Sequence, residues 1–148
     1  MPKLIFDPLH GFVELSSLCL KIVDTPIFQR LRKLKQLGVV YYVFPSANHT
    51  RFEHSIGVAF LAKKMLSTIQ SKQPELNITS DHLMCVEIAG LCHDLGHGPW
   101  SHLFDDFLKE VVTEKDDIDL LDHENRSCYL FQYLVEKEKL PLSPIHVK

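Results

Sequence analysis

The sequence predicts a mostly α-helical domain with very little sheet. Apolar residues recur at helical spacing in several long stretches, and proline and glycine residues separate these stretches as helix boundaries. The chain of 148 residues is 45% hydrophobic and 24% charged, which is the composition of an ordinary globular domain. No internal repeat or low-complexity linker divides it. We therefore expect a single helical unit over residues 1–148.

The first 24 residues are expected to form an N-terminal arm. Between Lys3 and Leu15, two short extended runs flank the segment DPLHG at residues 7–11. Proline and glycine in this segment favour a turn. The pattern predicts a small β-hairpin or an irregular extended arm, and it leaves both possibilities open.

A first helix is predicted to begin at Thr25, with this threonine as N-cap and Pro26 at the first helical position. Gly38 is its natural end. Its apolar stripe consists of Ile27, Leu31 and Leu34. Residues 39–44 (VVYYVF) are rich in β-branched and aromatic side chains, so their intrinsic preference predicts a strand, although a helical context can override it.

The rest of the chain predicts four more helices, at about residues 52–70, 80–95, 101–109 and 123–139. The apolar face of the first of these consists of Val58, Leu61, Ala62, Met65 and Ile69. Ser80 or Asp81 is expected to cap the second. The acidic stretch between the last two, residues 110–122, is expected to be a loop.

Composition narrows the classes of partner and compartment. A net charge of −3 does not indicate binding to nucleic acid or to an anionic membrane. Apolar runs are shorter than the ~20 residues that cross a bilayer, and the N-terminus lacks the apolar stretch of a signal peptide. We expect an intracellular protein of the nucleus or cytoplasm. Its four cysteines show no metal or disulfide spacing and are expected to be reduced thiols.

The most informative segment is LCHDLGHGP at residues 91–99, in a chain with nine histidines. Its adjacent His93 and Asp94 offer a nitrogen and an oxygen ligand about 100° apart around a helix, so both can bracket one ion where the helix ends. Imidazole with carboxylate suits Fe, Mn, Zn or, with water, Mg. A further ligand has to come from another helix. His54, near the start of the long helix, is the candidate.

Beyond this pair, His97 lies on a bend between Gly96 and Gly98. It is a candidate to donate a proton to a phosphate oxygen or a leaving group. The glycines are expected to adopt backbone conformations closed to other residues and so to let a substrate approach. The residues alone leave the ordinary alternative open, because a His-Asp pair arises by chance and a histidine on an apolar face is often a core residue.

Two segments, RFEHSIG at 51–57 and HDLGHGPWSH at 93–102, resemble the HD superfamily of metal-dependent phosphohydrolases. More narrowly, the chain is similar to the deoxynucleoside triphosphate triphosphohydrolases, in particular the vertebrate branch that joins a sterile-alpha-motif domain to an HD domain. Further similar segments are DPLHG (7–11), IVDTP (22–26), FQRLR (28–32), KQLG (35–38), YYVFP (41–45) and IAGLC (88–92). The resemblance is dense from residue 3 to about 107, and DHE at 122–124 is a later anchor.

This resemblance implies an HD-domain helical bundle. It also implies a reaction in which water attacks the α-phosphorus of a dNTP, releasing deoxynucleoside and inorganic triphosphate. By position, the implied ligands of a divalent metal ion are His54, His93 and Asp94. The implied phosphate-facing and proton-transfer residues are His97, Asp105 and His123. The implied substrate contacts are Arg51 as a phosphate clamp, Gln36 at the deoxyribose and His102 in the pocket wall.

The resemblance implies regulation as well, because activator nucleotides of the GTP or dGTP kind bind between subunits in this family and drive tetramer assembly. The matching residues are Lys3, Asp24, Gln29 and Arg32. The carboxylate of Asp24 suits the N–H donors of a guanine edge. For the basic residues 30–35, a solvated charged face remains the alternative to nucleotide binding. It stays open for all of them except Arg32.

One departure from the family concerns the metal site, which in the family closes with a second aspartate on a helix far downstream. No residue through Lys148 matches it, so we expect a partial HD domain with an arm (1–24), a helical metal-site core (25–109) and an acidic loop with a C-terminal helix (110–148). Three protein ligands with water can still hold a metal, as in catalytic zinc sites. The alternatives are therefore a dNTP triphosphohydrolase, of full or impaired activity, and an inactive nucleotide-binding module that associates with a full-length paralogue. A phosphodiesterase of another HD branch is a further alternative.

Overall fold

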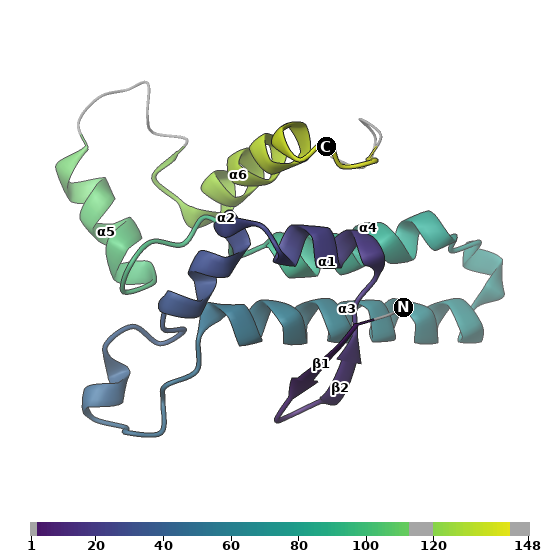
Figure 1. Ribbon diagram of the computed structural model, residues 1–148, viewed down its shortest axis with the longest axis horizontal. Coiled ribbons are helices and arrows are strands. Elements are labelled where there is room, and N and C mark those ends of the chain that lie inside the picture. Colours follow the sequence, from purple (N-terminus) through teal and green to yellow (C-terminus); the bar gives the residue numbers. More distant parts are fainter. Residues whose placement is uncertain (1–2, 113–119, 143–148) are drawn as a thin grey trace.

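The computed structural model describes residues 3–112 and 120–142 of the chain. Within these residues the fold is mostly helical with one small antiparallel sheet, which confirms the expected fold class. The α-helices are α1 (Ser17–Val23), α2 (Pro26–Gln29), α3 (Arg51–Lys72), α4 (Ser80–Cys92), α5 (His102–Val111) and α6 (His123–Lys137). Figure 1 shows α3 and α4 running side by side through the centre, with the hairpin on one side and α6 on the other.

At the N-terminus, β1 (Leu4–Asp7) pairs with β2 (Gly11–Glu14), so the hairpin forms rather than an irregular arm. The carboxylate of Asp7 accepts hydrogen bonds from the backbone N–H groups of Leu9 and His10, both at 2.8 Å, and thereby fixes the turn. Gly11 has φ +75°, a conformation that favours glycine. The turn chemistry of the DPLHG segment is therefore local and readable from the sequence.

Helix α1 lies within the segment that we expected to be an arm, and the sequence analysis missed it. Its N-cap is Ser16, whose hydroxyl accepts from the backbone N–H of Cys19 at 3.2 Å. The helix buries Leu18, Cys19, Ile22 and Val23. With seven residues it is too short to show a helical period in the sequence, and the serine cap was the one available signal.

Thr25 caps α2 and Pro26 occupies its first position, as predicted. The helix does not continue to Gly38, because it tightens into a 3-10 turn at Arg30–Lys33 and the backbone becomes extended at Leu34. There Leu34 accepts a hydrogen bond from the N–H of Arg51 at 2.8 Å, and Lys35 forms an isolated bridge with Thr50. Pairing with the start of α3 therefore ends this helix early.

The strand predicted at residues 39–44 is wrong, because the segment forms a 3-10 helix at Val40–Tyr42 and turns. Its side chains are exposed, with Tyr42 at 77% and Val43 at 74%. Within the described residues no strand lies beside it, and β-branched residues form a stable strand only when a neighbour completes the ladder.

Helices α3 and α4 form an antiparallel pair, which is the frame of the molecule. The face of α3 predicted to be apolar is wrong, because Leu61 and Met65 are 48% and 68% exposed. The helix instead buries Phe52, Ser55, Ile56 and Ala59. Ala59 meets Gly90 of α4 so closely that a Cβ on Gly90 would lie 3.1 Å from the Ala59 Cα. Small residues at this crossing let the two backbones approach.

The cap predicted for α4 at Ser80 or Asp81 is wrong by one or two residues, because Thr79 is the N-cap. Its hydroxyl accepts from the N–H of His82 at 3.3 Å, and the His82 ring accepts from the N–H of Thr79 at 3.1 Å. This is a capping box with histidine in place of the usual glutamate or glutamine.

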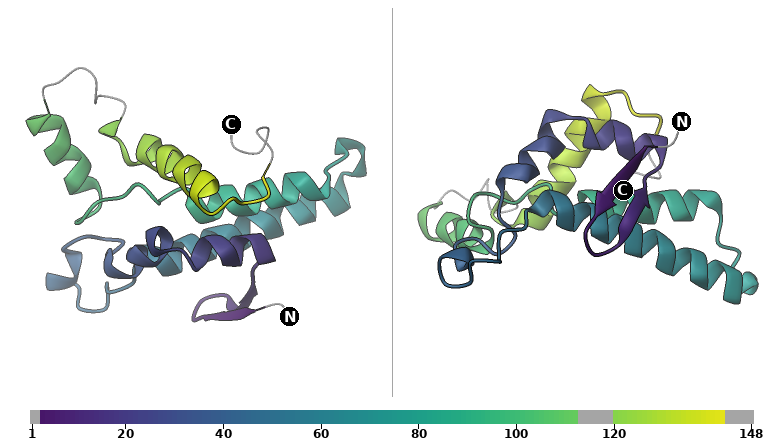
Figure 2. Two further views of the ribbon diagram at one scale, coloured as in Figure 1. Left: turned by 45° about the horizontal axis from the view of Figure 1, so that its top comes forward. Right: turned by 60° about the horizontal axis from the view of Figure 1, so that its bottom comes forward.

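The hydrophobic core joins β2, α1, α2, α3 and α4, and Leu134 of α6 is fully buried against it. The rings of Phe28 and Phe52 meet edge to face at 5.4 Å between centroids. Figure 2 shows α6 lying over this core while α5 stands apart at the end of the molecule. No helix of the described residues is long and apolar enough to cross a membrane. Part of the expected acidic loop, residues 113–119, lies outside the described residues.

Candidate metal centre and the adjoining histidine cluster

The predicted metal ligands His54, His93 and Asp94, which we call the metal triad, lie together in the structure. His54 is in the first turn of α3, and His93 directly follows the last residue of α4. Because the two helices are antiparallel, the start of α3 lies beside the end of α4. The Nε2 atoms of the two rings are 3.2 Å apart, and each lies 3.4 Å from an oxygen of Asp94.

This spacing fits one divalent ion. Ligand atoms with metal bonds of about 2.0–2.1 Å lie roughly 3.0–3.4 Å from one another around the ion. Two imidazoles and a carboxylate form a donor set suited to Fe, Mn or Zn. Both histidine side chains are partly exposed, at 33% and 38%, while Asp94 is 5% exposed, so the triad is buried on one side and open on the other.

The protonation of the two rings also suits a metal. Nδ1 of His93 lies 2.8 Å from the carbonyl oxygen of Gly90, which can only accept, so this nitrogen carries the hydrogen and Nε2 keeps its lone pair. Burial lowers the pKa of His54, although the nearby Asp94 opposes this change. The His54 ring is therefore neutral near pH 7 and able to offer a lone pair.

Arg51 lies beneath the triad and is 2% exposed. Its guanidinium donates to Asp94 at 2.5 Å and to the carbonyl oxygen of Gln36 at 3.5 Å. Burial alone would raise the pKa of Asp94, but the contact with His97 and the electrostatic interactions with His93 and Arg51 outweigh it, so this pKa lies well below its usual range. Asp94 is therefore ionised at all physiological pH values, as a metal ligand has to be.

After Asp94 the chain bends through Leu95, Gly96 and His97, and α6 packs on this bend. The N–H of Gly96 donates to the hydroxyl of Ser127 at 2.8 Å, and its carbonyl accepts from Nε of Arg126 at 2.9 Å. A side chain on Gly96 would collide with the backbone of His123 and Ser127. The space that glycine provides is therefore filled by α6.

The predicted role of the two glycines needs correction. Neither Gly96 nor Gly98 has a positive φ, and the residues that do are the neighbouring Trp100 (φ 62°) and Ser101 (φ 60°). A Cβ on Gly98 would collide with the ring of Phe104. Both glycines are needed because protein segments approach closely, and no substrate has to be invoked to explain them.

Four side chains beyond the bend, namely His97, His102, Asp105 and His123, form what we call the histidine cluster. The rings of His97 and His123 are stacked at 3.7 Å between centroids, and His102 meets both edge to face at 5.0 and 5.1 Å. Asp105 lies 2.7 Å from Nδ1 of His123 through Oδ2. The structure thus brings together all three predicted proton-transfer residues with the predicted pocket residue His102.

The stacking shows what the cluster can do. Rings stacked at an interplanar angle of 21° direct their in-plane lone pairs along nearly parallel lines, which do not converge on one ion. Hydrogen bonds from Arg126 and His123 outweigh the effect of burial and lower the pKa of Asp105. The ionised carboxylate accepts the Nδ1–H of His123 and leaves its Nε2 free to exchange a proton. The arrangement therefore suits proton transfer more than a second metal site.

His97 connects the cluster to the triad. It is 1% exposed, its Nε2 lies 3.5 Å from Asp94, and neither of its ring nitrogens has a hydrogen-bond partner among the described residues. Burial lowers its pKa, although Asp94 opposes the change, so the ring is neutral near pH 7. A buried imidazole without a partner is ready to bind a polar group of a ligand.

Gln36, predicted to contact substrate, lies close to this region through its backbone. Its carbonyl accepts from the hydroxyl of Ser101 at 3.1 Å, and its side-chain oxygen Oε1 is buried without a partner among the described residues. The hydroxyl of Ser101 also donates to Lys35 at 2.9 Å. These bonds anchor the turn at Trp100 and Ser101 that leads from the bend to α5.

The four predicted activator-site residues lie on one connected surface. Lys3 pairs with Asp24 at 3.6 Å, and both side chains are about two thirds exposed. Nε of Arg32 donates to the side-chain oxygen of Gln29 at 2.8 Å, and the Gln29 amide donates to the carbonyl oxygen of Val23 at 2.7 Å. Arg32 also lies over the ring of Phe52, 3.5 Å from its centroid.

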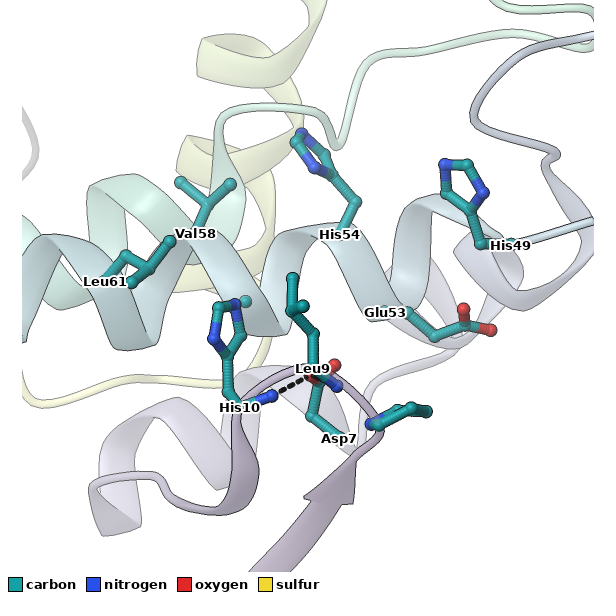
Figure 3. Close-up of a pocket in the computed structure, with 10 residues that line it drawn as sticks. Asp7, Leu9, His10, His49, Glu53, His54, Val58 and Leu61 are labelled. Atoms are coloured by element: carbon teal, nitrogen blue, oxygen red, sulfur yellow. Dashed lines mark hydrogen bonds between the residues drawn. The ribbon is translucent and has the colours of Figure 1, made fainter. Parts of the chain in front are cut away.

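A cleft of about 520 Å³ adjoins the metal triad between the hairpin turn and α3. Figure 3 shows His54 on its wall, with His10 and Leu9 of the turn facing α3. The sequence analysis did not predict this cleft. Of the predicted site residues only His54 lines it, so it borders the triad at this one residue and is separate from the histidine cluster.

Three further residues support the site and were missed by sequence reasoning: Arg30, Arg126 and Ser127. Arg30 donates to the carbonyl oxygens of Leu95 and His97, on the same bend. It had been counted only as part of a basic stretch. No spacing pattern pointed to Arg126 or Ser127, whose contacts with the bend are made to the backbone of Gly96, about 30 residues away.

Comparison with known proteins shows that residues 51–141 match the HD domain family. The chain is 50% identical to the deoxynucleoside triphosphate triphosphohydrolase SAMHD1 of Mus musculus, over 95% of the chain and 21% of that protein. It is 50% identical to the protein of the same name in Homo sapiens, over 90% and 21%. It is 44% identical to the SAMHD1 homolog of Dictyostelium discoideum, over 93% and 26%. The chain thus spans about a fifth to a quarter of the length of these curated relatives.

Proposed function

The chain belongs to the HD domain family, and from this membership we propose that it is a metal-dependent hydrolase of deoxynucleoside triphosphates. The observation that carries the proposal is the metal triad, in which the two Nε2 atoms lie 3.2 Å apart and each lies 3.4 Å from a different oxygen of Asp94. The relatives named as deoxynucleoside triphosphate triphosphohydrolases support dNTP as the substrate. The ion itself is Fe, Mn, Mg or Zn.

In the proposed reaction water attacks the α-phosphorus of a dNTP and the bond to the 5′-oxygen breaks, which gives deoxynucleoside and inorganic triphosphate. A divalent ion held by the triad would supply Lewis-acid polarisation of the phosphoryl group and of the attacking water. His123, oriented through Nδ1 by Asp105, acts in its protonated form and gives the proton on Nε2 to the leaving 5′-oxygen. His97 is buried and neutral, so its role is to donate an N–H hydrogen bond to a phosphate oxygen.

Substrate contacts are assigned to three more residues. Arg51 faces the triad and offers its guanidinium to the phosphates, although in this structure it is engaged with Asp94. The Oε1 atom of Gln36 is buried and has no partner within residues 3–112 and 120–142, so it is suited to accept a hydrogen bond from a hydroxyl of the deoxyribose. His102, exposed beside His97 and His123, forms the outer wall of the pocket.

Regulation by activator nucleotides of the GTP or dGTP kind is proposed for the surface formed by Lys3, Asp24, Gln29 and Arg32. Its support is that these residues form two pairs, Lys3 with Asp24 and Arg32 with Gln29, and that the Gln29 amide donates to the backbone of Val23, next to Asp24. Both charges are present, since Lys3 and Arg32 suit phosphate and Asp24 suits a guanine edge. The expected result of activator binding is a homo-oligomer, measured by light scattering with and without GTP.

The proposed activity is tested by incubating the protein with dGTP and Mn²⁺ and separating the products by ion-exchange chromatography. Inorganic triphosphate and deoxyguanosine are expected in equal amounts. His93→Ala and Asp94→Ala are expected to abolish product formation and metal binding together. A matched control is His82→Gln at the other end of α4, because glutamine at this position preserves the capping box. Activity that survives His93→Ala and Asp94→Ala would rule out the assigned site.

A second candidate function is an inactive nucleotide-binding module that associates with a longer paralogue. The observation that favours it is that residues 3–112 and 120–142 supply three ligands to the triad, one fewer than in the family's complete site. Metal content measured by mass spectrometry distinguishes the two. Near one ion per chain supports the hydrolase, and a content far below one ion supports the module.

A further inference from the structure

Arg126, in the first turn of α6, holds three separate segments with one guanidinium group. Its Nε donates to the carbonyl oxygen of Gly96 on the bend, at 2.9 Å. One terminal nitrogen donates to the carbonyl oxygens of Leu120 and Leu121, at 2.7 and 2.8 Å. The other forms an ion pair with Oδ1 of Asp105 on α5. The side chain is 15% exposed, so it is a largely buried hub.

The two oxygens of Asp105 are divided between two partners. Oδ1 is held by Arg126, and Oδ2 lies 2.7 Å from Nδ1 of His123. A carboxylate held at one oxygen cannot rotate, so the direction of the other oxygen is fixed as well. The orientation of the His123 ring therefore depends on the position of a guanidinium that does not touch it.

The same guanidinium fixes the bend that carries His97. Because Arg126 holds Gly96 next to His97, and Asp105 next to His123, it sets the relation between the two stacked rings. Arg30 provides a useful contrast, since it donates to Leu95 and His97 on the same bend but makes no contact with Asp105. Of these two arginines, only Arg126 connects the bend to Asp105 and, through it, to His123.

We propose that Arg126 is a positioning residue that aims His123 at the leaving group, by holding Asp105 and the bend in one rigid frame. The inference rests on the proposed hydrolase function. The planar fork of arginine is essential to it, because three of its nitrogens serve acceptors in three directions at once. A lysine retains the charge but offers one flexible ammonium, which cannot hold Asp105 and Gly96 in the same geometry.

The alternative is that Arg126 merely stabilises the docking of α6. The two roles differ in what Arg126→Lys does. If Arg126 only stabilises the fold, Arg126→Lys retains the positive charge, and the folded variant turns over substrate at the wild-type rate. A positioning role predicts a folded protein whose turnover is low, because a displacement near 1 Å at a reacting group costs about 100-fold in rate.

The test compares wild type, Arg126→Lys and Arg126→Gln in dGTP hydrolysis with Mn²⁺. Both variants are expected to lose about 100-fold in kcat while KM stays within about threefold. Lys109→Gln is the matched control, because the Lys109–Asp122 ion pair also links α5 to the start of α6, at 2.6 Å, without touching Asp105. This control is expected to retain wild-type kcat.

A second readout does not need activity. Ring ¹⁵N NMR of His123, recorded at a pH where the ring is neutral, is expected to show a single Nδ1–H tautomer in wild type and a mixture of tautomers in Arg126→Lys. Wild-type protein without hydrolysis would reject the proposed function, and the tautomer result would then decide the inference alone. If the wild-type protein is active, a wild-type kcat in Arg126→Lys overturns the inference that Arg126 positions His123. Loss of cooperative unfolding in both variants also overturns it, since it assigns Arg126 to stability.

Discussion

The metal triad and the histidine cluster lie side by side, joined through His97 and Asp94, yet they are supported in different ways. The triad is carried by α3 and α4, which are locked together by the core and by the close crossing at Ala59 and Gly90. The cluster is assembled from the bend, α5 and α6, and it depends on the contacts of Gly96. Metal binding is thus a property of a helical pair, and proton transfer is a property of the docking of α6. The two are separable by mutation.

The largest effect is expected from Arg51→Ala, which acts on the triad. Removing the guanidinium leaves Asp94 ionised and buried without its counter-charge, which costs about 3–5 kcal/mol in the free energy of unfolding. Urea denaturation measures this loss. Saturating Mn²⁺ is expected to recover part of it, because an ion on the triad supplies positive charge beside Asp94 and binds only the folded state.

The control for this change is Lys33→Ala, at an exposed position of the same basic stretch, with an expected change within about 0.5 kcal/mol. The ion pair also has a pH signature. The pKa of Asp94 is lowered in the folded state, so its contribution to stability is present above the unfolded pKa near 4 and is lost as pH falls further. An acid transition in wild type as steep as that in Arg51→Ala would contradict the assignment.

The second prediction tests whether the two regions can be disrupted independently. Gly96→Ala is directed at the docking of α6, and Gly90→Ala is directed at the metal triad. A methyl group on Gly96 collides with α6, so we expect a loss of about 2–3 kcal/mol, an undocked α6 and intact metal binding. A methyl group on Gly90 presses on the backbone of Ala59, so metal affinity is expected to fall instead. Thermal denaturation and metal titration of both variants measure the two properties. Equal loss of metal binding in both would show that the regions are not separable.

A smaller effect is expected from Ser127→Ala, which removes one contact between α6 and the bend. The N–H of Gly96 is buried and would lose its acceptor, which costs about 1–2 kcal/mol. Metal binding is expected to be unchanged. Hydrogen exchange of the Gly96 amide measures the local opening. An amide that remains as protected as in wild type would mean that another acceptor, such as water, replaces the hydroxyl.

The smallest effect is expected from the two buried cysteines, Cys19 and Cys92, and it concerns their reactivity and the pH dependence of stability. Burial raises the pKa of Cys19 from 9.0 to about 12, and it raises the pKa of Cys92 still further. At pH 8 we expect a thiol reagent to modify exposed Cys128 readily and these two only after unfolding. The stability that a protonated Cys19 provides is present below pH 9 and is lost as pH rises toward 12. Cys19→Ala is expected to remove this alkaline loss, as measured by unfolding at pH 8 and pH 10.

Much of the fold was predictable because its signals are local. The cap at Thr25, the turn after Asp7 and the start of α6 at His123 each depend on neighbouring residues, and each is present in the structure. The strand at residues 39–44 failed because intrinsic preference does not supply a partner strand. The predicted apolar face of α3 was wrong because Leu61 and Met65 have the spacing of a buried face but remain exposed in the structure.

The site was predictable to the extent that it repeats a family pattern. The structure brings together the residues of the triad and those of the histidine cluster, as the motifs implied. Arg126 and Ser127 could not be found in this way, because they hold the bend through the backbone of Gly96, and a backbone acceptor or donor leaves no mark on the sequence. The burial of Arg51 against Asp94 was also not predictable, since the same arginine suits either a phosphate or a carboxylate.

The close crossing of Ala59 and Gly90 has a consequence for selectivity among cations. It fixes how far apart the imidazoles of α3 and α4 stand, and hence the radius of the sphere that both can touch. Calcium, with bonds of 2.3–2.6 Å and a preference for oxygen donors, is expected to bind more weakly than ions whose bonds are near 2 Å. The helix crossing therefore sets the distance between the two imidazoles, and a bulkier side chain at position 59 is expected to increase this distance and to favour larger ions.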